Sequence, residues 1–154
     1  MKDLKHITES AKALGACRLL REGMSYRDLS GLLFSPQGRE FCAEKDFPGR
    51  ADLKGISEEC LERHGIYSGV TGSRIKVSKD ACFIKSYCSA EIEDSSVLHR
   101  IVALDNSEIK LLVEDYAVLD LNVSESSKAE VYKTKNSQIY PHGKGDVVII
   151  DIDL

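Results

Sequence analysis

The sequence predicts an α+β protein: an N-terminal cluster of short helices followed by a short β-solenoid. Residues 94–154 divide at polar turn residues into units of ten, apart from a first unit with one extra residue. In these units a small residue comes third and apolar residues then alternate with polar ones, the pattern of a strand with one buried face. The chain before residue 66 instead carries helix caps and helix-ending glycines. We therefore expect a helical head over residues 1–66 and a β-repeat (β-solenoid) domain over residues 67–154.

The composition is that of a folded, mildly acidic protein. The chain has 154 residues, of which 42% are hydrophobic and 30% charged, and its formal net charge is −4. This balance excludes a disordered chain. It also lacks the basic surplus of a typical nucleic-acid binder.

The cysteines indicate a reducing compartment. They are odd in number and form no CxxC pair, which argues against a disulfide framework and a zinc site. The N-terminal residues contain no apolar run of the length that a signal peptide needs, and no later stretch resembles a membrane span. We expect a cytoplasmic protein with buried thiols and no membrane contact. The cysteines are Cys17, Cys42, Cys60, Cys82 and Cys88.

The first two expected helices lie before residue 34. Residues 3–22 carry an apolar stripe at helical spacing, and Gly23 is expected to end that helix. Ser25 and Asp28 have the spacing of a capping box, so a second helix is expected to continue through Leu33.

Three further helical segments are expected before the repeats. Ser35-Pro36 provides an N-cap and a proline at the first helical position, and Phe47-Pro48-Gly49 ends the helix that follows. Residues 53–56 suggest one more helical turn, and Ser57 is expected to cap a last helix that ends at Gly65. These helices hold too little apolar surface for a core of their own, so we expect them to dock on the repeats.

The strands begin where the hydrophobic period changes near Ile66. Units before Asp94 are irregular in length, which predicts unequal turns or a bulge. After Asp105 the register is regular. The small third positions are Ser107, Ala117, Ser127 and Ser137, and the interior fifth positions are Ile109, Leu119, Ala129 and Ile139.

Two strand topologies fit this pattern, a β-solenoid and an antiparallel β-meander or sandwich. In a solenoid with two units per coil, residues twenty apart lie side by side. That spacing places Glu108 beside Lys128 and Lys110 beside Glu130, and opposite charges across a strand pair are stabilising. The solenoid is therefore favoured, with the meander as the alternative.

The repeat D-x-[SA]-x-Φ-x-Φ, preceded by LLFSPQGREFCAEKDFP, resembles a group of uncharacterised bacterial proteins with a short helical head and a β-solenoid body. The resemblance implies this architecture. It implies no activity, and no functional residue is carried over from it.

Parts of the sequence fit three kinds of chemical site, but the sequence favours none of them. The turn acids Asp94, Asp105, Asp115 and Glu125 form a column that could bind calcium, but the glycines of calcium-binding solenoids are absent. A small DNA-binding regulator would use Gln37 and Arg39 at the start of a helix, yet residues 1–68 are neutral overall. A thiol-dependent enzyme would use Cys42 or Cys88, but no local signature surrounds either of them, and His64, His99 and His142 are scattered. We expect no enzyme, no cofactor, no catalytic residue and no metal site.

Outward apolar residues are the main functional hint, because a contiguous exposed patch marks a covered surface. They predict a protein-interaction or scaffolding module whose contact residues are Leu112, Tyr116, Val118, Tyr132, Val148, Ile150 and Ile152. The last unit, GDVVIIDIDL, is apolar on both faces and lies at the end of the stack. Unless the helical head covers it, we expect a homodimer through this C-terminal strand.

Overall fold

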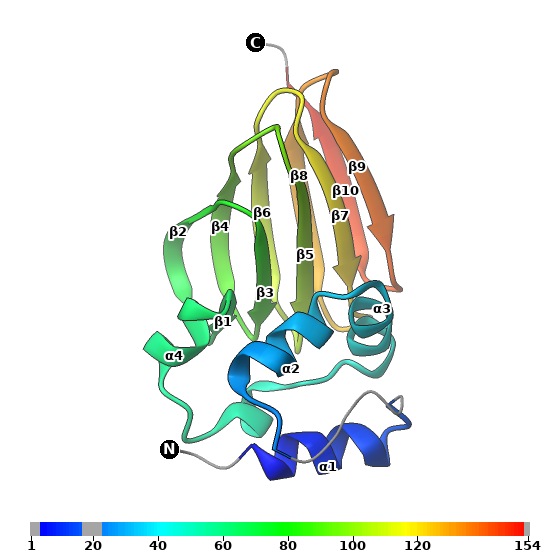
Figure 1. The fold of residues 1–154 in the computed structure, drawn as a ribbon. Coiled ribbons are helices and arrows are strands. Elements are labelled where there is room, and N and C mark those ends of the chain that lie inside the picture. The colour runs from blue at the N-terminus through cyan, green and yellow to red at the C-terminus, as the bar shows by residue number, and fades with distance from the viewer. Residues whose placement is uncertain (1–3, 17–22, 153–154) are drawn as a thin grey trace.

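The structure, a computed structural model, describes residues 4–16 and 23–152. Within them a helical head precedes a β-solenoid (Figure 1), as the sequence predicts. The helices are α1 (Lys5–Ala13), α2 (Tyr26–Leu33), α3 (Pro36–Lys45), the 3-10 helix η1 (Arg50–Leu53) and α4 (Glu58–Arg63). The strands are β1 (Ile66–Ser68), β2 (Thr71–Val77), β3 (Asp80–Ile84), β4 (Tyr87–Ile92), β5 (Leu98–Leu104), β6 (Glu108–Val113), β7 (Val118–Val123), β8 (Lys128–Lys133), β9 (Gln138–His142) and β10 (Asp146–Asp151).

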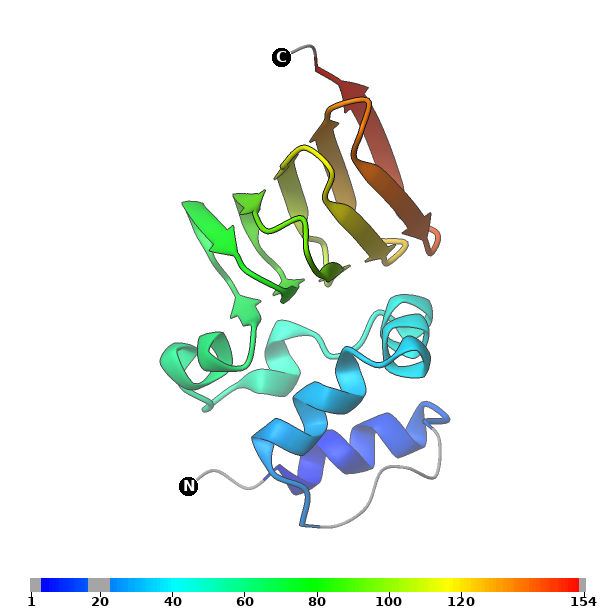
Figure 2. The same ribbon diagram turned by 45° about the horizontal axis from the view of Figure 1, so that its top comes forward.

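Successive strands alternate between two parallel sheets. Sheet A has the order β1-β3-β5-β7-β9 and sheet B the order β10-β8-β6-β4-β2. Every strand pair is parallel, so the antiparallel meander is wrong. Two strands make one coil, and the coils stack from β1 and β2 to β9 and β10 (Figure 2).

The stacking register is the predicted one. Glu108 lies beside Lys128 and Lys110 beside Glu130, each twenty residues apart. The earliest coils are irregular, with a register shift in β2 between Thr71 and its next paired residue. Since the repeat length sets the register, a constant unit of ten aligns each residue with its counterpart one coil later.

The small third positions form the corners of the coils. Ser107, Ala117, Ser127 and Ser137 are all buried. Ser107 Oγ donates to the carbonyls of Phe83 and Leu104, at 3.1 and 2.8 Å, and accepts from the N–H of Ser86. The corner hydroxyls thus satisfy buried backbone groups where the chain turns between the sheets, and Ala117 fits the same small position without a hydroxyl.

The helical head packs on the outer face of sheet A. Apolar residues of the head form one buried cluster with Cys82 and Ile84 of β3 and with Val102 and Leu104 of β5. The interior of the solenoid is a second cluster, which includes the predicted fifth positions. β3 and β5 are therefore apolar on both faces because both faces are covered.

The predicted helix caps are confirmed. Ser25 and Asp28 form a reciprocal capping box at α2. Ser35 Oγ accepts from the N–H of Gly38 at the start of α3, and Ser57 Oγ accepts from Cys60 N–H at α4.

The first helix is shorter than predicted. It ends at Ala13 and is followed by Gly15, whose φ of 95° suits glycine and stops the helix. The sequence predicted a helix that continues to residue 22. That prediction is wrong for residues 14–16, and residues 17–22 lie outside the described part of the chain.

Two sets of polar contacts attach the head to the solenoid. The buried guanidinium of Arg39 in α3 donates to the Phe34 carbonyl and, at 2.8 Å, to Asp120 Oδ2 in β7. The carboxylate of Asp46, just after α3, accepts from the N–H of Asp105 at 2.7 Å and from the hydroxyl of Ser126 at a corner of the coils. These contacts fix which coils lie beneath the head.

Candidate interaction surface and the cavity of the head

The last coil leaves interior side chains uncovered. Ile149 of β10 faces the solenoid core beside Val131, which is fully buried, yet 43% of its surface is exposed. Ile139 and Val147 are likewise only partly buried against the core. In the coils between the first and the last, such side chains are buried between two neighbouring coils. Within the described residues, nothing covers them here.

The outer face of sheet B near its last strand also carries apolar side chains. Leu112, Tyr132 and Ile150 are neighbours across β6, β8 and β10. Val148 precedes Ile150 by two residues on the same face of β10. Leu112 and Val148 are exposed, the latter by 54%. We call these four residues the β10 patch. The helices lie on sheet A, so the described part of the head leaves the patch open (Figures 1 and 2).

The remaining predicted contact residues lie apart from the β10 patch or at its border. Tyr116 is exposed in the turn before β7, and Val118 begins β7 on sheet A. Ile152 follows β10, and its N–H donates to the Lys133 carbonyl at 2.8 Å. The structure therefore gathers four of the seven predicted residues on one surface.

The four outermost strands differ in how they present their free edges. β1 is only three residues long. β2 carries a register shift and two outward cations, Arg74 and Lys76. β9 contains Pro141, which has no N–H to offer. Short strands, bulges, charge and proline are the usual protections against unwanted pairing. β10 is six residues long, has no register shift and no proline, and carries its charged residues, Asp146 and Asp151, only at its two ends.

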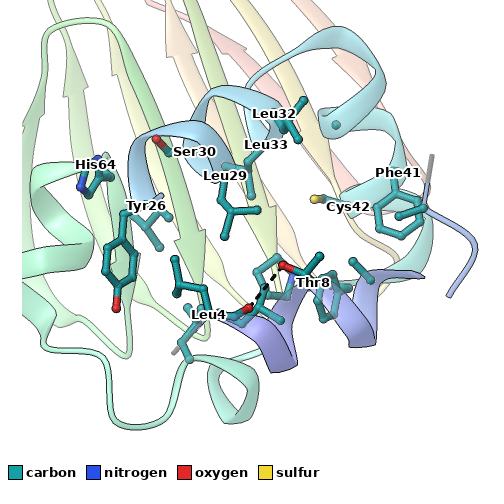
Figure 3. A pocket seen from close by; sticks show the side chains of 18 of the residues that line it. Leu4, Thr8, Tyr26, Leu29, Ser30, Leu32, Leu33, Phe41, Cys42 and His64 are labelled. Carbon is teal, nitrogen blue, oxygen red and sulfur yellow. Dashed lines mark hydrogen bonds between the residues drawn. The ribbon is translucent and has the colours of Figure 1, made fainter. Parts of the chain in front are cut away.

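A cavity of about 280 Å³ lies inside the head, between α1 and the helices above it (Figure 3). Its walls are mainly apolar. At one end the rings of Tyr26 and His64 stack with centroids 6.1 Å apart. The hydroxyl of Thr8 is already bonded to the Leu4 carbonyl at 3.3 Å. The lining residues labelled in Figure 3 are Leu4, Thr8, Tyr26, Leu29, Ser30, Leu32, Leu33, Phe41, Cys42 and His64.

Burial keeps the thiols of Cys42, at the cavity, Cys82, beneath the head, and Cys88, in the solenoid core, in their neutral form. Burial raises the pKa of Cys42 to about 12 and that of Cys88 to about 11. Burial also raises the pKa of Cys82, with a smaller contribution from Cys42. A nucleophilic cysteine needs a lowered pKa, so these environments work against the role considered for Cys42 and Cys88. Cys17 lies outside the described residues.

Arg39 is not placed to read a base. Its side chain is 7% exposed and makes the contacts with Phe34 and Asp120. Gln37 is exposed in the first turn of α3. One of the two side chains on which the nucleic-acid hypothesis rests is therefore unavailable in this structure.

The turn acids take part in local contacts. Asp94 Oδ1 accepts from Ser96, and these hydrogen bonds are the main reason why the pKa of Asp94 is lowered. Asp105 accepts from the N–H of Arg50 at 2.8 Å, and Asp115 accepts from Thr134. Among the described residues, no group of three or more His, Cys, Asp or Glu side chains is arranged to hold a metal ion.

The histidines lie in separate environments. His99 is fully buried, and its ring nitrogens lie 2.9 and 2.7 Å from the carbonyls of Lys79 and Asp94. His142 Nε2 lies 2.6 Å from Asp120 Oδ1, at ion-pair distance but without hydrogen-bond alignment. Neither ring is paired with a thiol.

Comparisons with known proteins give no relative. No family model matches the sequence, and neither a curated protein nor a solved structure matches it. In the part of the chain that the structure describes, no helix is long and apolar enough to cross a membrane.

Proposed function

We propose that this protein is a non-enzymatic protein-interaction or scaffolding module whose contact surface is the C-terminal coil of the solenoid. The observation that carries the proposal is β10. This strand exposes apolar side chains on both faces, and its free edge lacks the short length, the register shift and the proline found on the other outer strands. Contiguous exposed apolar surface and an open strand edge are both features of binding sites.

The chemistry of the remaining candidate sites supports the same assignment. The described lining of the cavity of the head is mainly apolar, which does not favour a polar substrate. Cys42 at this cavity and Cys88 in the solenoid core have raised pKa values, which is opposite to what nucleophilic catalysis needs. We include in the proposal a bacterial source, which the repeat resemblance suggests, and a reducing cytoplasmic location, which the free buried thiols favour.

The proposal is tested by comparing three baits in an extract of the source cells. The first is the wild-type protein, the second carries Val148→Lys in the β10 patch, and the third carries Leu98→Lys. Leu98 is a matched control because it is a similarly exposed apolar residue on the other sheet. We expect a partner that the wild type and the Leu98→Lys bait retain and the Val148→Lys bait loses.

The partner must also bind again after purification, with an affinity that Val148→Lys weakens at least about tenfold, which corresponds to 1.4 kcal/mol. Equal recovery of every captured protein on all three baits would show that the C-terminal coil is not a contact surface and would overturn the proposal.

A further inference from the structure

The free edge of β10 is the starting point. In a parallel sheet the N–H and C=O of one residue point to the same neighbouring strand, and those of the next residue point to the other side. The N–H groups of Asp146 and Ile152 donate to carbonyls of β8 and its preceding corner. The backbone groups of Val147, Ile149 and Asp151 therefore face away from β8, and no further strand pairs with them among the described residues.

The same reasoning explains why β9 is different. Gln138 N–H donates to the Ala117 carbonyl, so the even-numbered residues of β9 face β7. Pro141 then lies on the outward side, where its missing N–H removes a donor from the free edge of sheet A. Of the two strands of the last coil, β9 is therefore protected against further pairing, and β10 is open to it.

From this asymmetry we infer that β10 pairs with β10 of a second copy of the chain, antiparallel across a two-fold axis at Ile149. This inference rests on the proposed function and names its partner. A strand that pairs with β10 must be apolar on both faces, because one side covers Ile149 and the other continues the β10 patch. β10 itself has that composition, and a two-fold axis presents it to its own copy.

The position of the axis follows from the sequence of the strand. With Ile149 opposite its copy, Val147 pairs with Asp151 of the second chain. Every edge-facing residue of β10 then exchanges hydrogen bonds with an edge-facing residue of β10 in the other chain. On the outer face Val148 lies opposite Ile150. An axis one residue earlier would instead set Asp146 against Ile150 and move Asp151 opposite Gly145, outside the strand.

The assembly closes at two chains. Once β10 is paired, the remaining free edges are those of β1, β2 and β9, which are short, bulged and cationic, or blocked by Pro141. A two-fold contact through β10 uses the open edge, and among the described strands no comparable edge is then left for further growth. The expected particle is a dimer with a continuous sheet made from two copies of sheet B.

The first test is the oligomeric state in solution. We expect sedimentation of the wild type to give a dimer. Val148→Lys places a charge in the contact, and Ile149→Pro removes the edge-facing donor at the axis without touching a hydrogen bond to β8. Both variants are expected to sediment as monomers with an unchanged circular dichroism spectrum, whereas Val148→Thr, of similar shape and uncharged, keeps the dimer.

The second test examines the register. Residues opposite each other in a hydrogen-bonded antiparallel pair have Cα atoms about 5.5 Å apart. This lies within the roughly 4.4–6.8 Å that a disulfide spans. Ile149→Cys is therefore expected to cross-link two chains on oxidation, and Val147→Cys is not, because its opposite residue is Asp151. Peptide mapping identifies the bridge among the native cysteines.

A wild-type monomer at the highest soluble concentration would overturn the inference, as would a dimer that both β10 variants retain or a cross-link through Val147→Cys instead of Ile149→Cys. These results are distinguishable from failure of the proposed function. If the wild type is a monomer but captures a partner that the Val148→Lys bait loses, only the second copy of the chain is excluded as the partner of β10. A monomer without such a partner overturns both.

Discussion

Tyr116 adopts a backbone conformation that its side chain does not favour. Its φ is 67°, in the left-handed region, and the residue is 65% exposed in the turn before β7. Asp105 and Asn106 occupy the same region in the preceding turn of this kind, and both residue types tolerate it. The tyrosine thus holds local strain that no buried contact of the ring repays.

Replacing Tyr116 with asparagine is expected to stabilise the protein by about 1 kcal/mol, because asparagine adopts a positive φ more readily. Chemical denaturation measures the change. Tyr116→Phe is the control, since it keeps the strained conformation and is expected to leave stability unchanged. An asparagine variant no more stable than the wild type would show that the turn is not strained.

The cysteines are expected to differ sharply in reactivity. At pH 8 a thiol with a pKa of about 12, that of Cys42, is ionised in roughly one molecule in 10⁴. Cys60, at an intermediate level of burial, should therefore react with iodoacetamide well before Cys42, Cys82 and Cys88. Peptide mass spectrometry of the native protein gives the order, and unfolding in denaturant should abolish it. Rapid native alkylation of Cys42 would contradict its burial.

The same thiols make stability depend on alkaline pH. In the unfolded chain they release their protons near the ordinary pKa of 9.0, whereas the folded chain retains those of Cys42 and Cys88 up to about 12 and about 11. Between these values the folded state binds more protons, so the free energy of unfolding falls as pH rises above 9. Denaturation at pH 8 and 10 should show a steeper loss in the wild type than in a Cys42→Ala, Cys88→Ala variant. Equal losses would exclude the thiols as the cause.

At the scale of one strand, alternation decides which substitutions the fold tolerates. Leu111 and Leu112 are adjacent in β6, but Leu111 is fully buried in the solenoid core and Leu112 is 41% exposed. Leu111→Asp is expected to unfold the protein, because an unpaired buried carboxylate costs several kcal/mol against a stability of roughly 5–15 kcal/mol. Leu112→Asp should cost less than about 1 kcal/mol. Thermal unfolding compares them, and similar losses would place both leucines in the core.

Much of the solenoid could be predicted because residue size and polarity recur at fixed positions of its repeat. The small corner positions and the interior positions recur every ten residues, and the observed register of twenty follows from them. The caps of α2, α3 and α4 were also predictable, since each depends on one serine and its near neighbours. The extent of α1 was not, because its apolar stripe continues beyond Gly15, where the backbone turns.

The placement of the head and the free edges needed the three-dimensional structure. A signal for the head was present, since β3 and β5 are apolar on both faces and such strands are covered on both. Pro141 likewise marks an edge strand in the sequence. The pairing of Arg39 with Asp120, 81 residues apart, had no local signal at all.

At the scale of the whole molecule, the head and the solenoid depend on each other. The head covers the outer face of sheet A, so the contact surface is left to sheet B and the last coil. Apolar packing supplies most of this attachment, because Cys82, Ile84, Val102 and Leu104 of the two strands are fully buried in the shared cluster. The ion pair of Arg39 and Asp120 fixes the position of α3 within it.

Breaking this pair is expected to loosen the head without changing the C-terminal coil. Arg39→Met leaves the Asp120 carboxylate short of its main partner, a change that costs roughly 3–5 kcal/mol in fully buried pairs. We expect the lower end of that range, because Asp120 is 19% exposed and His142 lies beside it.

The double variant Arg39→Met, Asp120→Leu removes both charges and should recover most of the loss. Denaturation measures the coupling between the two sites, and hydrogen exchange shows whether amides of α3 lose protection before those of β8. A double variant as unstable as the sum of the single ones would show that the two side chains act independently, and the attachment of the head would then rest on apolar packing alone.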